Sequence, residues 1–153
     1  MRKLVLFFST ILLLVFLSSI DAFAAVTVCE TVMNNDGSYY TSTIEVTPFH
    51  EAVRSSTVTS SKTKMHYSSN GDRRWHVKVT GSFTYGNGTA VCNSASVSTG
   101  VYASGWYIIN RTATASGNQA TATATAKQVS NGVTIQTITS SVTLTCSSSG
   151  VLS

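Results

Sequence analysis

Charged side chains are scarce in this chain, because Asp, Glu, Lys and Arg make up only 10% of its 153 residues. Soluble proteins average about a quarter. Runs of Leu, Glu, Lys and Ala at helical spacing are also absent, which excludes a helical bundle. Proline occurs once, at Pro48, and there is no Gly-Pro period, so the chain is not a collagen-like fibre.

Acidic side chains are also few, with six Asp and Glu residues in total. No Asp or Glu follows Asp72, so residues 73–153 carry only positive formal charge. A glycosidase needs two carboxyl groups across one sugar bond, and the few acids present form no recognisable pair. A zinc spacing of Cys and His, a phosphate loop and a dinucleotide fingerprint are missing too. We therefore expect no catalytic residues, no bound metal and no cofactor.

Hydroxyl groups supply the polarity that charge does not. Residues 25–153 contain 21 serines and 22 threonines, one third of that segment. Apolar and polar side chains alternate along most of it, and turn residues separate the alternating segments. The pattern predicts strands at 26–33, 38–47, 53–67, 74–85, 89–101, 105–115, 119–129 and 133–146.

Strands with one apolar face each must pack face to face or close on themselves. We therefore predict a single all-β domain at residues 25–147, folded as an antiparallel β-sandwich of Ig-like or meander topology. A small β-barrel is the alternative. Residues 148–153 follow the last strand and are expected to fray.

The N-terminal segment 1–24 has the order of a secretory signal peptide. Two basic residues precede an apolar run at 4–17, and small residues lead up to a cleavage site after Ala24, with cleavage after Ala25 as the alternative. The run is short for a bilayer-spanning helix, and no later segment replaces it, so we expect no transmembrane segment. The sequence predicts a protein secreted to the extracellular side.

Export permits disulfide bonds. Cys92 and Cys146 both lie in well-patterned strands, and we predict a bond between them that stabilises the fold by roughly 4 kcal/mol. Cys29 is then left over, either as a free thiol or as the link of a covalent dimer. The alternative is that all three cysteines are reduced.

A two-residue loop at 117–118 would set alanines opposite alanines on one face of a hairpin, and threonines opposite threonines on the other. We expect the alanine face to lie inside and the threonines in solvent. Tyr107 and Ile109 continue the alanine face, which places Trp106 outside, where its ring is free to stack on a sugar. The alternative is that Trp106 is buried, either because the strand presents the opposite face or because a loop covers the ring.

The loop at 86–88 has two alternatives. A three-residue loop places Val91, Ala95 and Val97 beside the core but turns Cys92 outward, whereas a two-residue loop buries Cys92 opposite Phe83 and exposes the valines. A β-bulge would reconcile the two arrangements.

The stretches VKVTGSFTYGNGTAVCNSASVS and VTLTCSSSGVLS, together with the leader, resemble small exported proteins of Gram-positive bacteria that are catalogued as a domain of unknown function. The resemblance covers roughly residues 75–153. It implies an extracytoplasmic β domain and assigns no functional residue.

Positive side chains gather between residues 54 and 78, at Arg54, Lys62, Lys64, Arg73, Arg74 and Lys78. Trp75 belongs to the core by its alternation, which leaves Arg74, His76 and Lys78 on the outer face of the same strand. We predict that these three residues and Trp106 bind an anionic cell-wall polymer or glycan. The alternative is a solvated strand face that binds nothing. We expect no nucleic-acid partner, because exported proteins rarely meet one.

The sequence thus favours an exported, non-catalytic β domain that binds an anionic or carbohydrate surface of a cell envelope. The alternative function is a small secreted hydrolase with a Ser or Cys nucleophile and one of His50, His66 and His76 as its base.

Overall fold

The computed structural model describes residues 25–46 and 55–153, which contain strands and turns but no helix. The strands are β1 (Ala25–Met33), β2 (Tyr39–Val46), β3 (Ser56–Tyr67), β4 (Arg73–Gly86), β5 (Thr89–Val101), β6 (Trp106–Ser116), β7 (Gln119–Ser130) and β8 (Val133–Thr145). Each overlaps one predicted strand, because an alternation with period two is a local signal. The predicted signal peptide lies outside the described residues.

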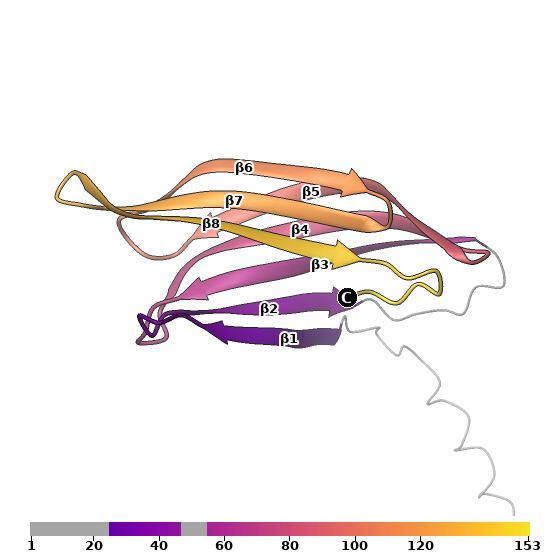
Figure 1. Cartoon of the computed structure of the whole chain (residues 1–153), viewed down its shortest axis with the longest axis horizontal. Coiled ribbons are helices and arrows are strands. Elements are labelled where there is room, and N and C mark those ends of the chain that lie inside the picture. The colour runs from indigo at the N-terminus through magenta and orange to yellow at the C-terminus, as the bar shows by residue number, and fades with distance from the viewer. Residues whose placement is uncertain (1–24, 47–54) are drawn as a thin grey trace, which may run out of the picture.

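Two antiparallel sheets make up the domain, one of five strands in the order β1-β2-β3-β4-β5 and one of three in the order β6-β7-β8. Figure 1 shows them as two stacked layers that do not close into a barrel. The predicted β-sandwich is therefore confirmed. Within each sheet every strand pairs with its neighbour in sequence, so both sheets are meanders, and the chain passes from one sheet to the other between β5 and β6.

The smaller sheet covers only part of the larger one. Its strands pack on β3, β4 and β5, whereas β1 and β2 extend beyond it in Figure 1. The core lies where the sheets overlap, between the buried side of β4 and the alanine face of β7. Its members include Trp75, Val77, Val79, Phe83, Ala120, Ala122, Ala124 and Ala126.

The β6–β7 hairpin has the register predicted for a loop at 117–118, with Ala115 opposite Ala120 and Thr114 opposite Thr121. The alanines of β7 are buried and the threonines beside them point outward, as expected. Here the sequence identifies both the partner residues and the inner face.

Our prediction for the other end of this hairpin is wrong. Trp106 is only 4% exposed, whereas Tyr107 is 54% exposed. A β-bulge between Ile108 and Asn110 inserts Ile109 as an extra residue, and an extra residue reverses the face that each earlier side chain takes. Trp106 therefore enters the core, and Tyr107 and Ile109 point to solvent.

A second bulge settles the ambiguous β4–β5 hairpin. The loop is the two-residue turn Asn87-Gly88, and Cys92 is buried opposite Phe83. The register then shifts between Ser82 and Phe83, which brings Val97 opposite the buried Val79. Ala95 and Val97 therefore pack against the core together with Cys92, whereas Val91 is 52% exposed.

The predicted bond between Cys92 and Cys146 is wrong, because the two thiols are free, buried and not at disulfide distance. The turn of the β6–β7 hairpin bonds to the backbone of both cysteines. The Cys92 N–H donates to the carbonyl of Gly117 at 2.7 Å, and the Cys146 N–H donates to that of Asn118 at 3.0 Å. The side chain of Cys29 lies outside the described residues.

The C-terminal residues do not fray as expected. Thr145 and Ser153 exchange backbone hydrogen bonds of 2.9 and 3.0 Å, and Leu152 forms a bridge with Cys146 and packs against the core. Gly150, with a φ of 85°, provides the reversal that makes this return possible. Residues 147–153 therefore belong to the folded domain.

Candidate functional site

Two of the predicted ligand-binding residues lie on the outer face of the five-stranded sheet, and each has a partner within the protein. Lys78 Nζ lies 2.9 Å from a carboxylate oxygen of Glu45. Hydrogen bonds from Lys78 and Ser61 lower the pKa of Glu45, so this carboxylate remains ionised. The Nδ1 atom of His76 lies 3.0 Å from the hydroxyl oxygen of Tyr102.

The other two predicted residues, Arg74 and Trp106, lie against each other. The Arg74 guanidinium carbon is 5.6 Å from the centre of the Trp106 ring, within reach of a cation–π interaction. Because Trp106 is buried, its ring offers no open face to a sugar. The exposed aromatic residue of this strand is its neighbour, Tyr107.

Lys62 and Lys64, also part of the predicted cluster, point away from Lys78. They share the face of the buried Val77 and Val79, at the side where the smaller sheet ends. Lys64 Nζ lies 3.7 Å from the centre of the Tyr40 ring, and burial lowers the pKa of this lysine. The cluster is therefore divided between two faces of one sheet, and its member Arg54 lies outside the described residues.

His66 is buried and stacks on Trp75, with ring centres 4.3 Å apart and planes 8° apart. Burial, followed by the charges of Lys64 and Arg74, lowers the pKa of His66 to about 4. Its Nε2 atom has no hydrogen-bond partner in the described part of the chain. His66 is therefore a neutral core residue at pH 7.

The described residues give no support to the hydrolase alternative. Burial raises the pKa of the Cys92 thiol and that of the Cys146 thiol, which keeps both protonated. Within residues 25–46 and 55–153, no Ser or Cys bonds to His66 or His76, and no group of three His, Cys, Asp or Glu is placed to hold a metal. His50 lies outside that range.

Nothing among the described residues forms a helix that is long and apolar enough to span a bilayer.

The outer face of the three-stranded sheet is a flat array of hydroxyl groups, which we call the hydroxyl face. Its members are Thr112, Thr114, Thr121, Thr123, Thr125, Thr139, Ser141 and Thr143. Hydrogen bonds join hydroxyls across β7 and β8, at 2.9 Å for Thr121–Thr143, 2.7 Å for Thr123–Ser141 and 2.9 Å for Thr125–Thr139. These bonds hold the rows in fixed positions.

One end of the hydroxyl face carries an aromatic ring beside a cation. Tyr107 of β6 pairs directly with Lys127 of β7, and both share the face of Thr125. The bulged Ile109 is exposed close to Tyr107 along β6. Lys127 and Arg111 are the only charged residues of β6, β7 and β8.

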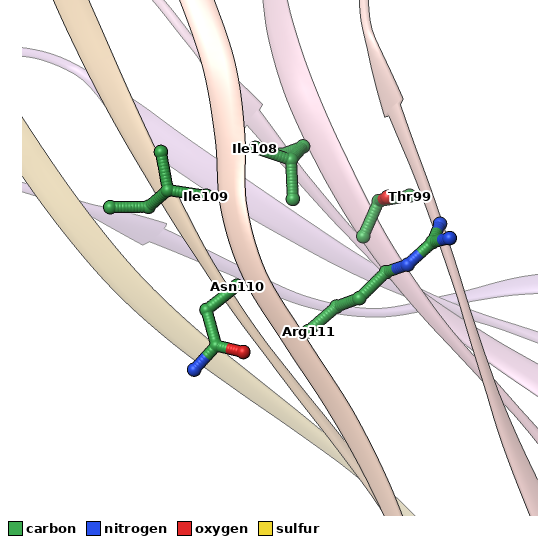
Figure 2. Close-up of a pocket in the computed structure, with 5 residues that line it drawn as sticks. All are labelled: Thr99, Ile108, Ile109, Asn110 and Arg111. Carbon is green, nitrogen blue, oxygen red and sulfur yellow. The ribbon is translucent and has the colours of Figure 1, made fainter.

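A shallow hollow of about 460 Å³ lies between the edge strands of the two sheets, lined by Thr99 of β5 and by residues 108–111 of β6. Figure 2 shows Ile108 and Arg111 projecting towards Thr99, whereas Ile109 and Asn110 project from the other side of β6. Sequence reasoning missed Arg111, because it lies far from the basic cluster and its neighbour Thr99 belongs to another sheet. The signal available in the sequence was the absence of acids after Asp72, because it leaves Arg111 without an acidic residue in its own part of the chain.

No protein-family model, no curated protein and no solved structure matches this chain. The resemblance of residues 75–153 to small exported proteins therefore stays a prediction.

Proposed function

We propose that this protein is an exported, non-catalytic module that binds an anionic glycan of a cell envelope through the hydroxyl face. The observation that carries the proposal is the direct pairing of Tyr107 with Lys127 at the end of the ordered hydroxyl rows. An exposed ring, a cation and fixed hydroxyls are the groups that a charged sugar polymer needs.

The ring of Tyr107 supplies apolar contact area. A tyrosine in a strand has few rotamers, so little conformational entropy is lost when a flat sugar ring packs on it. The threonine and serine hydroxyls along the sheet both donate and accept hydrogen bonds, which suits the hydroxyls of a polysaccharide. A flat face of three strands suits an extended polymer better than a small molecule, because small molecules favour concave sites.

Charge favours an anionic polymer over a neutral one. The three-stranded sheet carries Arg111 and Lys127 and no acid, so its potential is positive. The described five-stranded sheet and its turns carry five cations and four acids, so most of their positive charge is offset and a net charge of +1 remains. The smaller sheet has two cations and no acid, so its charge of +2 has no carboxylate within the sheet to offset it.

The Arg74, His76 and Lys78 face is the less favourable surface. Binding a polymer there would compete with the ion pair between Lys78 and Glu45 and with the contact between His76 and Tyr102. On the hydroxyl face, the side chains of Tyr107 and Lys127 have no hydrogen-bond or ion-pair partner among the described residues, so a ligand gains these contacts without breaking others.

Affinity chromatography tests the proposal. The purified protein is applied to columns that carry a polyuronate, a poly(glycerol phosphate) or a neutral glucan, at low and at high salt. We expect retention on the anionic columns at low salt and release at high salt, because exposed charges are screened. We expect Tyr107→Ala to weaken binding about tenfold, equivalent to roughly 1.4 kcal/mol.

The matched control is Tyr102→Ala, which removes a tyrosine that is 52% exposed but lies beside His76. It should bind as the unchanged protein does. Failure of the unchanged protein to bind any column at low salt would overturn the proposal. Equal losses for the two tyrosine variants would overturn the assignment to the hydroxyl face.

The export part of the proposal has its own test. Mass spectrometry of the protein expressed in a Gram-positive host should find a chain that begins at Ala25 in the culture medium. Recovery from the cytosol alone, with residues 1–24 attached, would contradict export.

A further inference from the structure

We propose that the hollow between β5 and β6 is an anion subsite, in which Arg111 holds the singly charged oxyanion of an acidic glycan, either a carboxylate or a phosphodiester. The inference rests on the proposed function, since the hydroxyl face holds the rest of the polymer. It adds a specific position for the charged group and a reason for selecting acidic sugars.

The size and walls of the hollow suit one charged sugar unit. Its volume of about 460 Å³ lies within the range of about 300–1,000 Å³ that small-molecule sites occupy. Ile108 supplies an apolar wall, and Thr99 supplies a hydroxyl on the facing strand. A sugar ring has both kinds of surface, an apolar face and a polar rim.

Arg111 is a cation without an internal partner. Its side chain is exposed. Within residues 25–46 and 55–153, the ion pair is formed by Lys78 and Glu45, and Arg111 takes part in none. No acid follows Asp72 in the chain, so β5 and β6 carry no carboxylate that competes for the guanidinium. An incoming anion therefore meets a cation that is free to bind it.

The guanidinium has the geometry for this role. It is planar and presents parallel N–H groups that pair with both oxygens of a carboxylate or phosphate, whereas a lysine ammonium acts as a point charge. In Figure 2 the Arg111 side chain reaches across the hollow past Thr99, so its donors point away from β6 towards the β5 side. A bound oxyanion would sit between the two strands.

The bulge in β6 connects the hollow to the hydroxyl face. The inserted residue Ile109 and its neighbour Asn110 lie on one side of the strand, and Ile108 and Arg111 lie on the other. Because β6 is an edge strand, a polymer that crosses it contacts both sides. The same bulge that exposes Tyr107 therefore allows one ligand to contact both the Tyr107 ring and the Arg111 guanidinium.

Isothermal titration calorimetry with three oligomers of equal length tests the subsite: an oligogalacturonate, a glycerol-phosphate oligomer and a neutral gluco-oligosaccharide. We expect Arg111→Gln to weaken binding of the charged oligomers at least tenfold and to leave the neutral one unchanged. Arg111→Lys should recover only part of the loss, because it restores the charge but not the planar fork. Arg73→Gln, which removes an exposed arginine outside the hollow, is the matched control and should bind normally.

The outcomes separate this inference from the proposed function. If Arg111→Gln binds both charged oligomers like the unchanged protein while Tyr107→Ala binds them weakly, the subsite is wrong and the hydroxyl face stands. If the unchanged protein binds none of the oligomers, both proposals fall. A loss confined to the oligogalacturonate identifies the ligand group as a carboxylate, and a loss confined to the glycerol-phosphate oligomer identifies a phosphodiester. Unchanged thermal midpoints confirm that the variants are folded.

Discussion

Gly81 lies directly against Ala120 across the sandwich: a Cβ added to Gly81 would be 2.7 Å from the Cβ of Ala120 and 2.7 Å from the ring of Phe83. The backbone of β4 therefore approaches the alanine face of β7 with no room for a methyl group between them. This contact sets how closely the two sheets pack, and it explains why β7 uses alanine where other cores use larger residues.

Gly81→Ala is expected to destabilise the protein by about 1–3 kcal/mol, because overpacking a close contact forces neighbouring groups to move. A lower urea midpoint with an unchanged slope would show this effect. Ser96→Ala, at an exposed position of β5, is the control and should change the midpoint little. A Gly81→Ala variant as stable as the unchanged protein would contradict the close packing.

Stability should fall as the pH drops from about 6.5 to about 4, through His66. Burial lowers the pKa of His66 in the folded protein to about 4, whereas the unfolded chain binds the proton near its ordinary value of 6.5. Between these values the unfolded state holds more protons, so acid favours unfolding. The loss should reach about 3 kcal/mol at the lower end, measured by urea unfolding at a series of pH values.

His66→Phe isolates this effect. Phenylalanine keeps an aromatic ring against Trp75 but cannot take up a proton. The variant should lose most of the change in stability between pH 6.5 and pH 4. If its pH profile matches that of the unchanged protein, another group is responsible.

The thiols of Cys92 and Cys146 should be protected from alkylation in the folded protein. Both are buried, and burial raises the pKa of each, so little thiolate is exposed to a reagent. Peptide mapping after treatment with N-ethylmaleimide should find both residues modified only when the protein is unfolded first. Rapid labelling without denaturant, or a peptide in which the two are joined, would contradict the structure.

Deleting residues 151–153 should destabilise the domain by about 1–3 kcal/mol. The deletion removes the apolar contact of Leu152 and the two backbone hydrogen bonds between Thr145 and Ser153. Thermal unfolding of the truncated chain measures the loss. A control, Leu152→Met, keeps an apolar side chain of similar size and should stay close to the original midpoint. An unchanged midpoint after the deletion would mean that the contacts of residues 151–153 with Thr145 and Cys146 do not stabilise the domain.

Much of the fold could be read from neighbouring residues. Alternation predicts the strands, and turn residues such as those at 117–118 predict the hairpins, because both signals act over a few residues. The pairing of alanine with alanine and threonine with threonine also identified the β6–β7 register and its inner face. These features depend on the face to which each side chain of a strand points, and in a regular strand that face follows from the residue's position in the sequence.

The residues of the candidate site were harder to predict from the sequence than the strands. The basic cluster is contiguous in sequence, but its members lie on two faces of one sheet, and Lys78 has its own acidic partner. The alternation along β6 predicts the wrong face for Tyr107, and nothing in the residue order singles out Arg111. Both errors come from neighbours that are distant in the chain.

The amino-acid order alone sufficed for the all-β class, the strand positions and the hydroxyl-rich surface, since each follows from local alternation. The three-dimensional arrangement was needed to show the bulge at Ile109, the separation of Cys92 from Cys146, and the meeting of Thr99 with Arg111. A bulge is selected by how a strand fits its partner and the opposing sheet. That fit is a sum of long-range contacts, and no short stretch of sequence records it.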